Sequence, residues 1–167
     1  LVNLPLLERL VLENVPLIIS TGMSNLDEVD EAAAFLHRRR AHFILLHCQS
    51  TYPAPPETLN LSMLTKLRSR YSVPVGYSGH ELGIYSTIAA VALGAKVVER
   101  HITLDRALPG PDHLASLEPG EFKELVRRIR ECETAMGVPV RRISRGEVAN
   151  RLTLRKSLVA VARIAKG

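Results

Sequence analysis

The sequence predicts an α/β protein built on a parallel sheet, and three observations carry that prediction. Four short apolar runs occur along the chain, and each precedes a segment with helical periodicity. The runs are apolar on both faces, as is typical of parallel strands covered by helices. No G-x-G-x-x-G follows the first run, so a dinucleotide-binding fold has no support. Four such units in 167 residues fit one domain, either half of a (β/α)8 barrel or a small open sheet.

The strands are expected where β-branched and apolar residues cluster. Because they alternate with helical segments, they belong to one sheet with right-handed crossovers. The expected strands are Val15–Ser20, Phe43–Cys48, Val73–Tyr77 and Lys96–Ile102.

Helices are expected before, between and after these strands. Ser24 and Asn60 each precede a helical pattern and can cap it. Asp27 and Glu28 follow Ser24 in the first turn, where the helix dipole favours acids. Gly94 ends the fourth helix in a position typical of glycine. The expected helices are Leu4–Glu13, Ser24–His37, Leu61–Tyr71, Gly83–Leu93 and Pro119–Met136.

Composition excludes several classes of protein. Hydrophobic residues make up 46% and charged residues 23% of the chain, as in soluble globular proteins. No apolar run reaches the roughly 18 residues of a membrane helix, and no signal peptide opens the chain. The two cysteines, Cys48 and Cys132, lack metal-ligand spacing, and we expect free thiols and a cytoplasmic location. Aromatic residues are only 4%, which argues against a surface that stacks nucleic-acid bases.

The net charge of +5 comes from one end of the chain. Residues 137–167 carry eight Lys or Arg and one acid, whereas residues 1–136 carry fourteen and sixteen. A basic segment can bind nucleic acid or anionic lipid, but a solvated linker or a partner-docking segment explains the pattern more simply.

All four expected strands end in polar residues, where the loops of an α/β protein converge on a site. If the strands stay extended, Ser78 and His80 share one face, and so do Glu99 and His101. Two histidines from neighbouring strands can bind one metal ion as neutral imidazoles. The alternative is that each satisfies a buried backbone group.

The remaining histidines and two proline-rich loops give weaker signals. His37 and His42 flank a run of arginines and are expected at the surface, while His47 fits a satisfied core histidine. Prolines stiffen the segments around Tyr52 and Asp112, which can hold these side chains for a ligand or merely connect elements.

Six stretches resemble the sialic acid synthase family, which includes N-acetylneuraminate synthase and its 9-phosphate-forming relatives. They occur in family order and span nearly the whole chain. The stretches are Ile18–Met23, His47–Pro55, Gly76–Gly83, Ala89–Ala95, Glu99–Asp105, and Gly110–His113 with Ser116–Pro119.

The resemblance implies the C-terminal half of a (β/α)8 TIM barrel that condenses phosphoenolpyruvate with N-acetylmannosamine or its 6-phosphate. It implies Mn2+ or Mg2+ as a Lewis acid held by His80 and His101. It implies that Ser20 and Ser78 contact phosphoenolpyruvate. It also implies that Ser50 stands at another position that lines the substrate site. It places Tyr52 and Asp112 on the amino sugar.

The resemblance also implies a domain division and missing parts. Residues 1–137 match a partial synthase barrel, and residues 138–167 match a basic linker and the start of a truncated antifreeze-like domain. We therefore expect a homodimer in the full-length protein, no nucleic-acid or membrane partner, and a fragment that is inactive and poorly stable alone. The alternatives are a synthase for legionaminate, pseudaminate or a spore-coat sugar, a non-catalytic assembly piece, and a basic nucleic-acid-binding module.

Overall fold

The computed structural model describes residues 1–167 and divides them into two compact units, Leu1–Met136 and Gly137–Gly167. The first unit is an α/β structure whose four strands pair in parallel in the order β1-β2-β3-β4. The predicted fold class, a parallel sheet of four βα units, is confirmed. The strands are β1 (Leu17–Ser20), β2 (Phe43–Cys48), β3 (Val75–Gly79) and β4 (Val98–Arg100).

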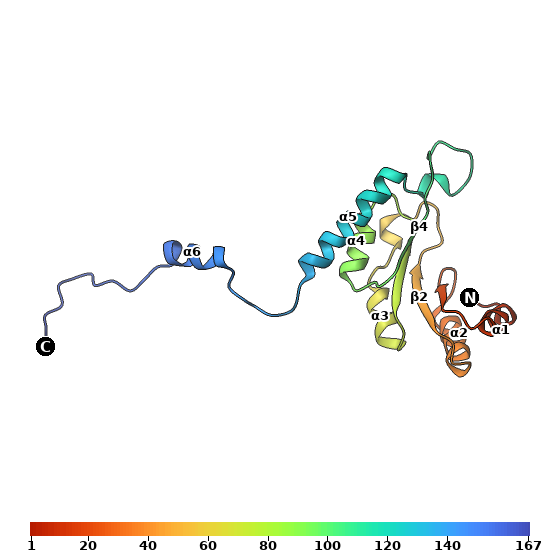
Figure 1. Cartoon of the computed structure of the whole chain (residues 1–167), viewed down its shortest axis with the longest axis horizontal. Coiled ribbons are helices and arrows are strands. Elements are labelled where there is room, and N and C mark those ends of the chain that lie inside the picture. The colour runs from red at the N-terminus through yellow and green to blue at the C-terminus, as the bar shows by residue number, and fades with distance from the viewer. The chain divides into compact units, whose positions relative to one another are not determined.

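Each strand is followed by a helix, and one more helix precedes the sheet. Helices α3, α4 and α5 lie along one side of the sheet in Figure 1, and α1 lies beside α2. Short 3-10 turns at Pro56–Thr58 and His113–Ala115 interrupt the loops after β2 and β4. The α-helices are α1 (Leu4–Leu12), α2 (Leu26–Arg38), α3 (Met63–Arg70), α4 (Tyr85–Ala92), α5 (Pro119–Met136) and α6 (Arg145–Leu154).

The hydrophobic core lies between one face of the sheet and helices α2, α3 and α4. Leu36, Leu67 and Ala90, one from each helix, are at most 1% exposed and pack with strand residues such as Leu45 and Tyr77. This burial of apolar area is what holds the helices on the sheet. The opposite face of the sheet is less well covered, because Ile18 on the edge strand β1 is 56% exposed.

The start of α2 differs from the prediction. Asn25, not Ser24, is the N-cap, and it forms a capping box with Glu28. The Asn25 side chain accepts from the Glu28 backbone, and the Glu28 carboxylate accepts from the Asn25 backbone, so two helix-end donors are satisfied at once. The Ser24 hydroxyl instead donates to the Gly22 carbonyl.

The third βα unit is also shifted from its predicted limits. Asn60 does not cap α3: its φ is +45°, and the helix begins three residues later at Met63. The prolines before it direct the chain into a 3-10 turn instead. Strand β3 begins at Val75 and runs to Gly79, because Pro74 has no N–H to give to the sheet.

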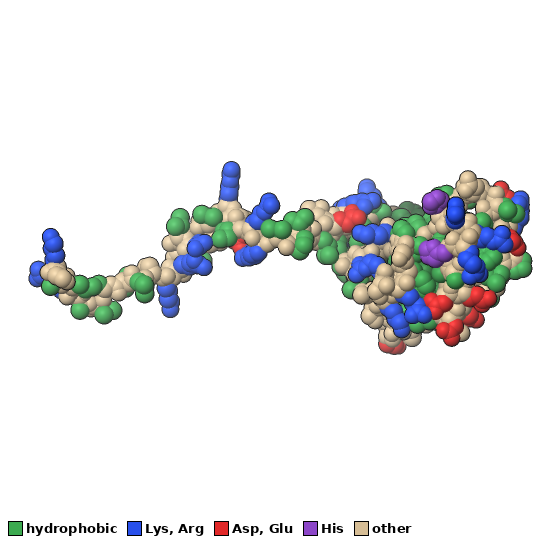
Figure 2. All heavy atoms as spheres, turned by 90° about the horizontal axis from the view of Figure 1, so that it is seen from below, with side chains coloured by type: hydrophobic (Ala, Val, Ile, Leu, Met, Phe, Trp, Pro, Cys, Tyr) green, Lys and Arg blue, Asp and Glu red, His purple; other side chains and the backbone are tan.

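The second unit, Gly137–Gly167, contains α6 and extended segments on either side of it. Ser144 and Glu147 form a capping box at the start of this helix. Figure 2 shows Lys and Arg side chains spread along this part of the chain, and none of its residues is buried. Among all the helices, none is both long enough and apolar enough to cross a membrane.

Candidate functional site

Three polar side chains form a row across the C-terminal ends of the inner strands. Cys48 on β2 is in register with Ser78 on β3, and Ser78 is in register with Glu99 on β4. Residues in register in a parallel sheet project from the same face, so the three form one row, here called the front row. The Ser78 hydroxyl donates to the Glu99 carboxylate at 2.8 Å.

His80 and His101 lie one residue beyond the ends of β3 and β4. Their ring centroids are 5.1 Å apart, with the ring planes inclined at 67°. Backbone hydrogen bonds hold both residues in place: Ala54 N donates to the His80 carbonyl, and Leu117 N donates to the His101 carbonyl. The structure therefore brings the two predicted ligands together.

The hydrogen bonds of His80 determine which ring nitrogen is available. Its Nδ1 lies 2.8 Å from the Gln49 carbonyl oxygen, and because a carbonyl only accepts, Nδ1 is the donor. The lone pair of the neutral ring is then on Nε2, and a backbone partner on the other nitrogen is the usual arrangement for a metal-binding histidine. No group of three or more His, Cys, Asp and Glu side chains is arranged around a common ion site.

Tyr52 covers the two histidines from the loop after β2. Its ring centroid is 4.1 Å from that of His80 and 5.6 Å from that of His101. Burial raises the pKa of the Tyr52 phenol, and the charges of Cys48, Asp112 and Glu99 raise it further. The phenol is therefore a neutral hydrogen-bond donor at neutral pH.

Cys48 is the residue of this site that sequence reasoning missed most clearly. Burial alone raises the pKa of its thiol, but hydrogen bonds to His80, Ser20 and Ser50 together lower the pKa to about 7. Its Sγ is 3.8 Å from His80 Nδ1 and 3.7 Å from Ser50 Oγ. Two of the three predicted serines, Ser20 and Ser50, thus lie next to Cys48, and the third, Ser78, is its register partner on β3.

The His80 imidazole is affected by the same contact. Burial lowers its pKa, but the hydrogen bonds to Cys48 and to the Gln49 carbonyl outweigh burial and raise the pKa overall. Both cysteines, Cys48 and Cys132, are free thiols, as predicted.

Asp112 is the predicted site residue whose side chain is least well held by the protein. It lies on the exposed loop before the 3-10 turn at His113–Ala115, and its carboxylate makes no hydrogen bond to the protein. Its charge nevertheless contributes to the raised pKa of Tyr52. His113 is occupied elsewhere, because its Nδ1 is 2.7 Å from the Thr103 hydroxyl.

A second polar group lies behind the strands, on the side facing α4. Glu81 and Arg100 form an ion pair, and Tyr77 and Thr87 both donate to the Glu81 carboxylate. These four buried residues are called here the buried network. Its two charged members adjoin the two histidines in sequence, and that adjacency was a signal that sequence reasoning did not use.

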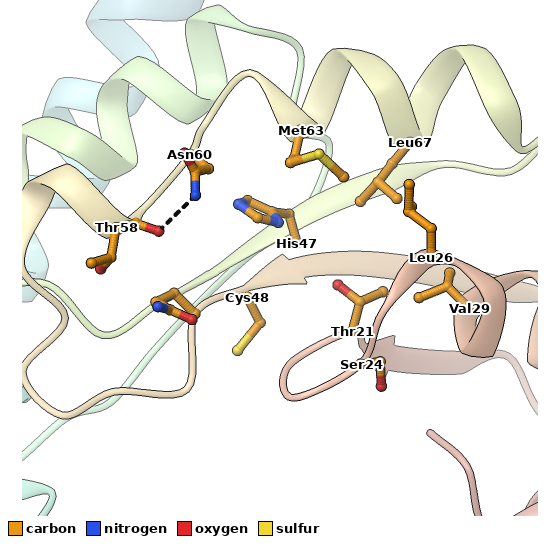
Figure 3. Close-up of a pocket in the computed structure, with 11 residues that line it drawn as sticks. Thr21, Ser24, Leu26, Val29, His47, Cys48, Thr58, Asn60, Met63 and Leu67 are labelled. Carbon is orange, nitrogen blue, oxygen red and sulfur yellow. Dashed lines mark hydrogen bonds between the residues drawn. The ribbon is translucent and has the colours of Figure 1, made fainter.

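A pocket of about 200 Å³ opens between the sheet and helices α2 and α3, and Cys48 of the front row also lines it (Figure 3). His47 lines it and is a satisfied core histidine, as predicted: its Nε2 lies 2.7 Å from the Leu59 carbonyl oxygen. Burial lowers the pKa of His47, so the ring is neutral. His37 and His42 are exposed, also as predicted.

The chain is similar to two synthases of known name. It is 46% identical to the N,N'-diacetyllegionaminic acid synthase of Campylobacter jejuni over 168 residues, covering 99% of this chain and 50% of that protein. It is 44% identical to the human N-acetylneuraminate-9-phosphate synthase over 166 residues, covering 99% of this chain and 46% of that protein. The chain thus spans about half the length of these relatives.

Solved structures agree with these relatives. The N-acetylneuraminic acid (sialic acid) synthetase of Leptospira borgpetersenii, in complex with citrate, superimposes with a TM-score of 0.81 at 35% identity. The match covers 93% of this chain and 55% of that one. The four-stranded sheet is therefore part of a TIM barrel rather than a small open sheet. The model of the NeuB family matches residues 1–141, which is most of the sequence, and the chain belongs to the NeuB family.

Proposed function

We propose that the protein carrying this chain condenses phosphoenolpyruvate with N-acetylmannosamine or its 6-phosphate. A carbon–carbon bond forms between the enol carbon of phosphoenolpyruvate and the aldehyde carbon of the sugar. Water enters, inorganic phosphate leaves, and the product is N-acetylneuraminate or its 9-phosphate. The observation that carries this proposal is the pair of adjacent imidazoles, His80 and His101, at the C-terminal edge of a parallel sheet.

The two histidines suit a divalent ion, Mn2+ or Mg2+. The Gln49 carbonyl occupies Nδ1 of His80, which leaves Nε2 for the ion. Such an ion supplies Lewis-acid chemistry, since it polarises a carbonyl oxygen. The chain brings only these two imidazoles together, so substrate oxygens, water or residues outside this chain would complete the coordination.

Other residues at this edge would bind the substrates. The hydroxyls of Ser20 and Ser50 can donate hydrogen bonds to the carboxylate or phosphate of phosphoenolpyruvate, and Ser78 can do so when its proton turns from Glu99 to the substrate. The Tyr52 ring, which is tilted by 31° against that of His80, would cover the amino sugar, and the unpaired Asp112 carboxylate would accept hydrogen bonds from the sugar hydroxyls. In this proposal the second unit is the linker to an antifreeze-like domain that completes the site in a homodimer.

The test uses the full-length protein with phosphoenolpyruvate, N-acetylmannosamine or its 6-phosphate, and Mn2+. We expect phosphate release to be lost in the variant His80→Ala, His101→Ala. The matched control is His42→Ala, which removes an exposed histidine outside this site and leaves activity unchanged. Full activity in the double variant would refute the two-histidine assignment.

A second candidate is a synthase for legionaminate or a related sugar. The 46% identity to a legionaminate synthase is as high as the 44% identity to a neuraminate 9-phosphate synthase. The same assay with the diacetamido precursor of legionaminate separates the two. Phosphate release with that precursor alone would assign the protein to the legionaminate branch.

A further inference from the structure

A buried ion pair links the two residues that adjoin the histidines. Glu81 directly follows His80, and Arg100 directly precedes His101. Arg100 Nη1 lies 2.9 Å from Glu81 Oε1, and the two side chains are 0% and 2% exposed. The pair therefore connects the end of β3 to the end of β4 immediately behind the two imidazoles.

Arg100 also donates hydrogen bonds to the backbone that follows His80. Its Nη2 donates to the Glu81 carbonyl at 2.6 Å, and its Nη1 donates to the Gly83 carbonyl at 2.9 Å. A planar guanidinium can make these bonds and the ion pair at once, because its donors form a rigid fork. The turn after His80 is thereby tied to the strand that leads into His101.

The Glu81 carboxylate is equally constrained. Its Oε2 accepts from the Tyr77 hydroxyl at 2.9 Å, and its Oε1 accepts from Thr87 at 2.7 Å as well as from Arg100. Tyr77 is a core residue and Thr87 belongs to α4, so the carboxylate is anchored to the helix-facing side of the sheet. Neither member of the pair can shift without breaking several hydrogen bonds.

Stability alone does not explain this arrangement. Desolvation of two charges offsets most of their attraction. Apolar residues of similar volume in the same place often stabilise a fold as well as a buried ion pair or better. What an ion pair adds is a defined direction and separation. Arg100 and Glu81 point away from the front row, so they hold the histidines without competing for a ligand.

We propose that the Glu81–Arg100 pair is a positioning device that holds His80 and His101 at the separation at which both imidazoles bind one divalent ion. This inference rests on the proposed function for the ion itself. Glu81 and Arg100 are positioning residues and contact neither the ion nor the substrates.

The test is the variant Arg100→Lys in the full-length protein. Lysine keeps the charge but has a single ammonium, which cannot bond to the Glu81 carboxylate and both carbonyls together. We expect its dissociation constant for Mn2+, measured by calorimetry, to rise about tenfold or more, as is usual when the outer partners of metal ligands are lost. In a crystal structure of the metal-free variant, we expect the separation of the two rings to change by more than about 0.5 Å.

Two further variants make the result decisive. Glu81→Gln is measured in the same way, and it decides the test alone if Arg100→Lys does not fold. Leu67→Ala is the control for general destabilisation, because Leu67 is a buried residue on α3 and belongs to a core cluster that includes neither histidine. It should unfold more easily while its Mn2+ affinity stays within about twofold of the parent.

Three outcomes decide the matter. Unchanged Mn2+ affinity and ring separation in the two pair variants would overturn the positioning role. An equal loss of affinity in Leu67→Ala would overturn it as well, since the effect would then be general loosening. If the parent protein binds no Mn2+ through these histidines, the proposed function fails, and the ring separation in the metal-free variant still decides the positioning role.

Discussion

Two polar groups occupy opposite faces of the same strand ends. The front row, Cys48, Ser78 and Glu99, is partly open and retains hydrogen-bonding capacity for a ligand. The buried network behind it uses nearly all of its capacity internally, with Arg100 Nε as its one unpartnered atom. Polar residues at a strand end therefore do not identify a site by themselves. The face they occupy and the hydrogen bonds they have left decide their role.

The largest expected effect is the loss of one charge from the buried network. Glu81→Ala leaves the guanidinium of Arg100 buried without its counter-ion, and we expect it to lower the free energy of unfolding by about 3–5 kcal/mol. The matched change Glu99→Ala, at the exposed residue of the front row, should cost less, about 1–2 kcal/mol, because it removes only the hydrogen bond from the Ser78 hydroxyl. Urea unfolding of the full-length protein measures both. Equal losses would erase the contrast between the two faces.

A smaller effect is expected from one hydroxyl of the buried network. Tyr77→Phe removes the donor to Glu81 without changing the packing of the ring, and hydrogen bonds to charged groups contribute about 1.5–3 kcal/mol. Tyr85→Phe on α4 is the control, because Tyr85 is 84% exposed. Thermal unfolding should separate the two variants. A stable Tyr77→Phe protein would show that the carboxylate is held well enough by its other partners.

The sequence predicted the sheet and the two histidines of the site better than it predicted the buried network. Apolar periodicity located all four strands, and alternation along β3 and β4 anticipated that His80 and His101 would meet. The buried network was not predicted, because a charged residue in a sequence normally indicates a side chain exposed to solvent. Only the three-dimensional fold shows that Arg100 points into the helix layer, where Glu81 neutralises it.

The limits of the elements were predicted less well for a local reason. Ser24 and Asn25 are both good N-cap residues, and the choice depends on which is followed three residues later by a glutamate. Asn25 and Glu28 satisfy that spacing, so the capping-box pattern would have selected the right residue. The 3-10 turn before α3 has no comparable signal beyond its prolines.

The helix layer gives a prediction of intermediate size. Asn25→Ala removes a side chain that caps α2, and we expect a loss of about 1 kcal/mol in the free energy of unfolding. Ser24→Ala should change stability by only a few tenths of a kcal/mol, because its hydroxyl makes a single long bond to the Gly22 carbonyl. Urea unfolding of the two variants side by side tests this. The reverse order would mean that Ser24 is the residue that starts the helix.

The smallest effect is expected at an exposed ion pair, which contrasts with the buried one. Arg70 and Tyr71 both donate to the Asp30 carboxylate, and these hydrogen bonds hold its pKa at about 2, below the ordinary value of 3.8. Because the pKa is lower in the folded protein, the stabilisation is complete above pH 3.8. It is lost as the pH falls from about 4 to about 2.

Two changes separate this pair from the other carboxylates. Asp30→Asn should flatten the change of the free energy of unfolding with pH between about pH 4 and pH 2. The slope of that free energy against pH near neutrality should stay unchanged. Arg70→Gln should move the Asp30 pKa, followed by carboxyl 13C NMR, upward towards 3.8. Added salt should weaken this exposed pair but not the buried Glu81–Arg100 pair, because solvent ions screen only charges that they can approach. If salt affects both alike, Glu81 and Arg100 are open to water, and the two faces of the strand ends differ less than their geometry indicates.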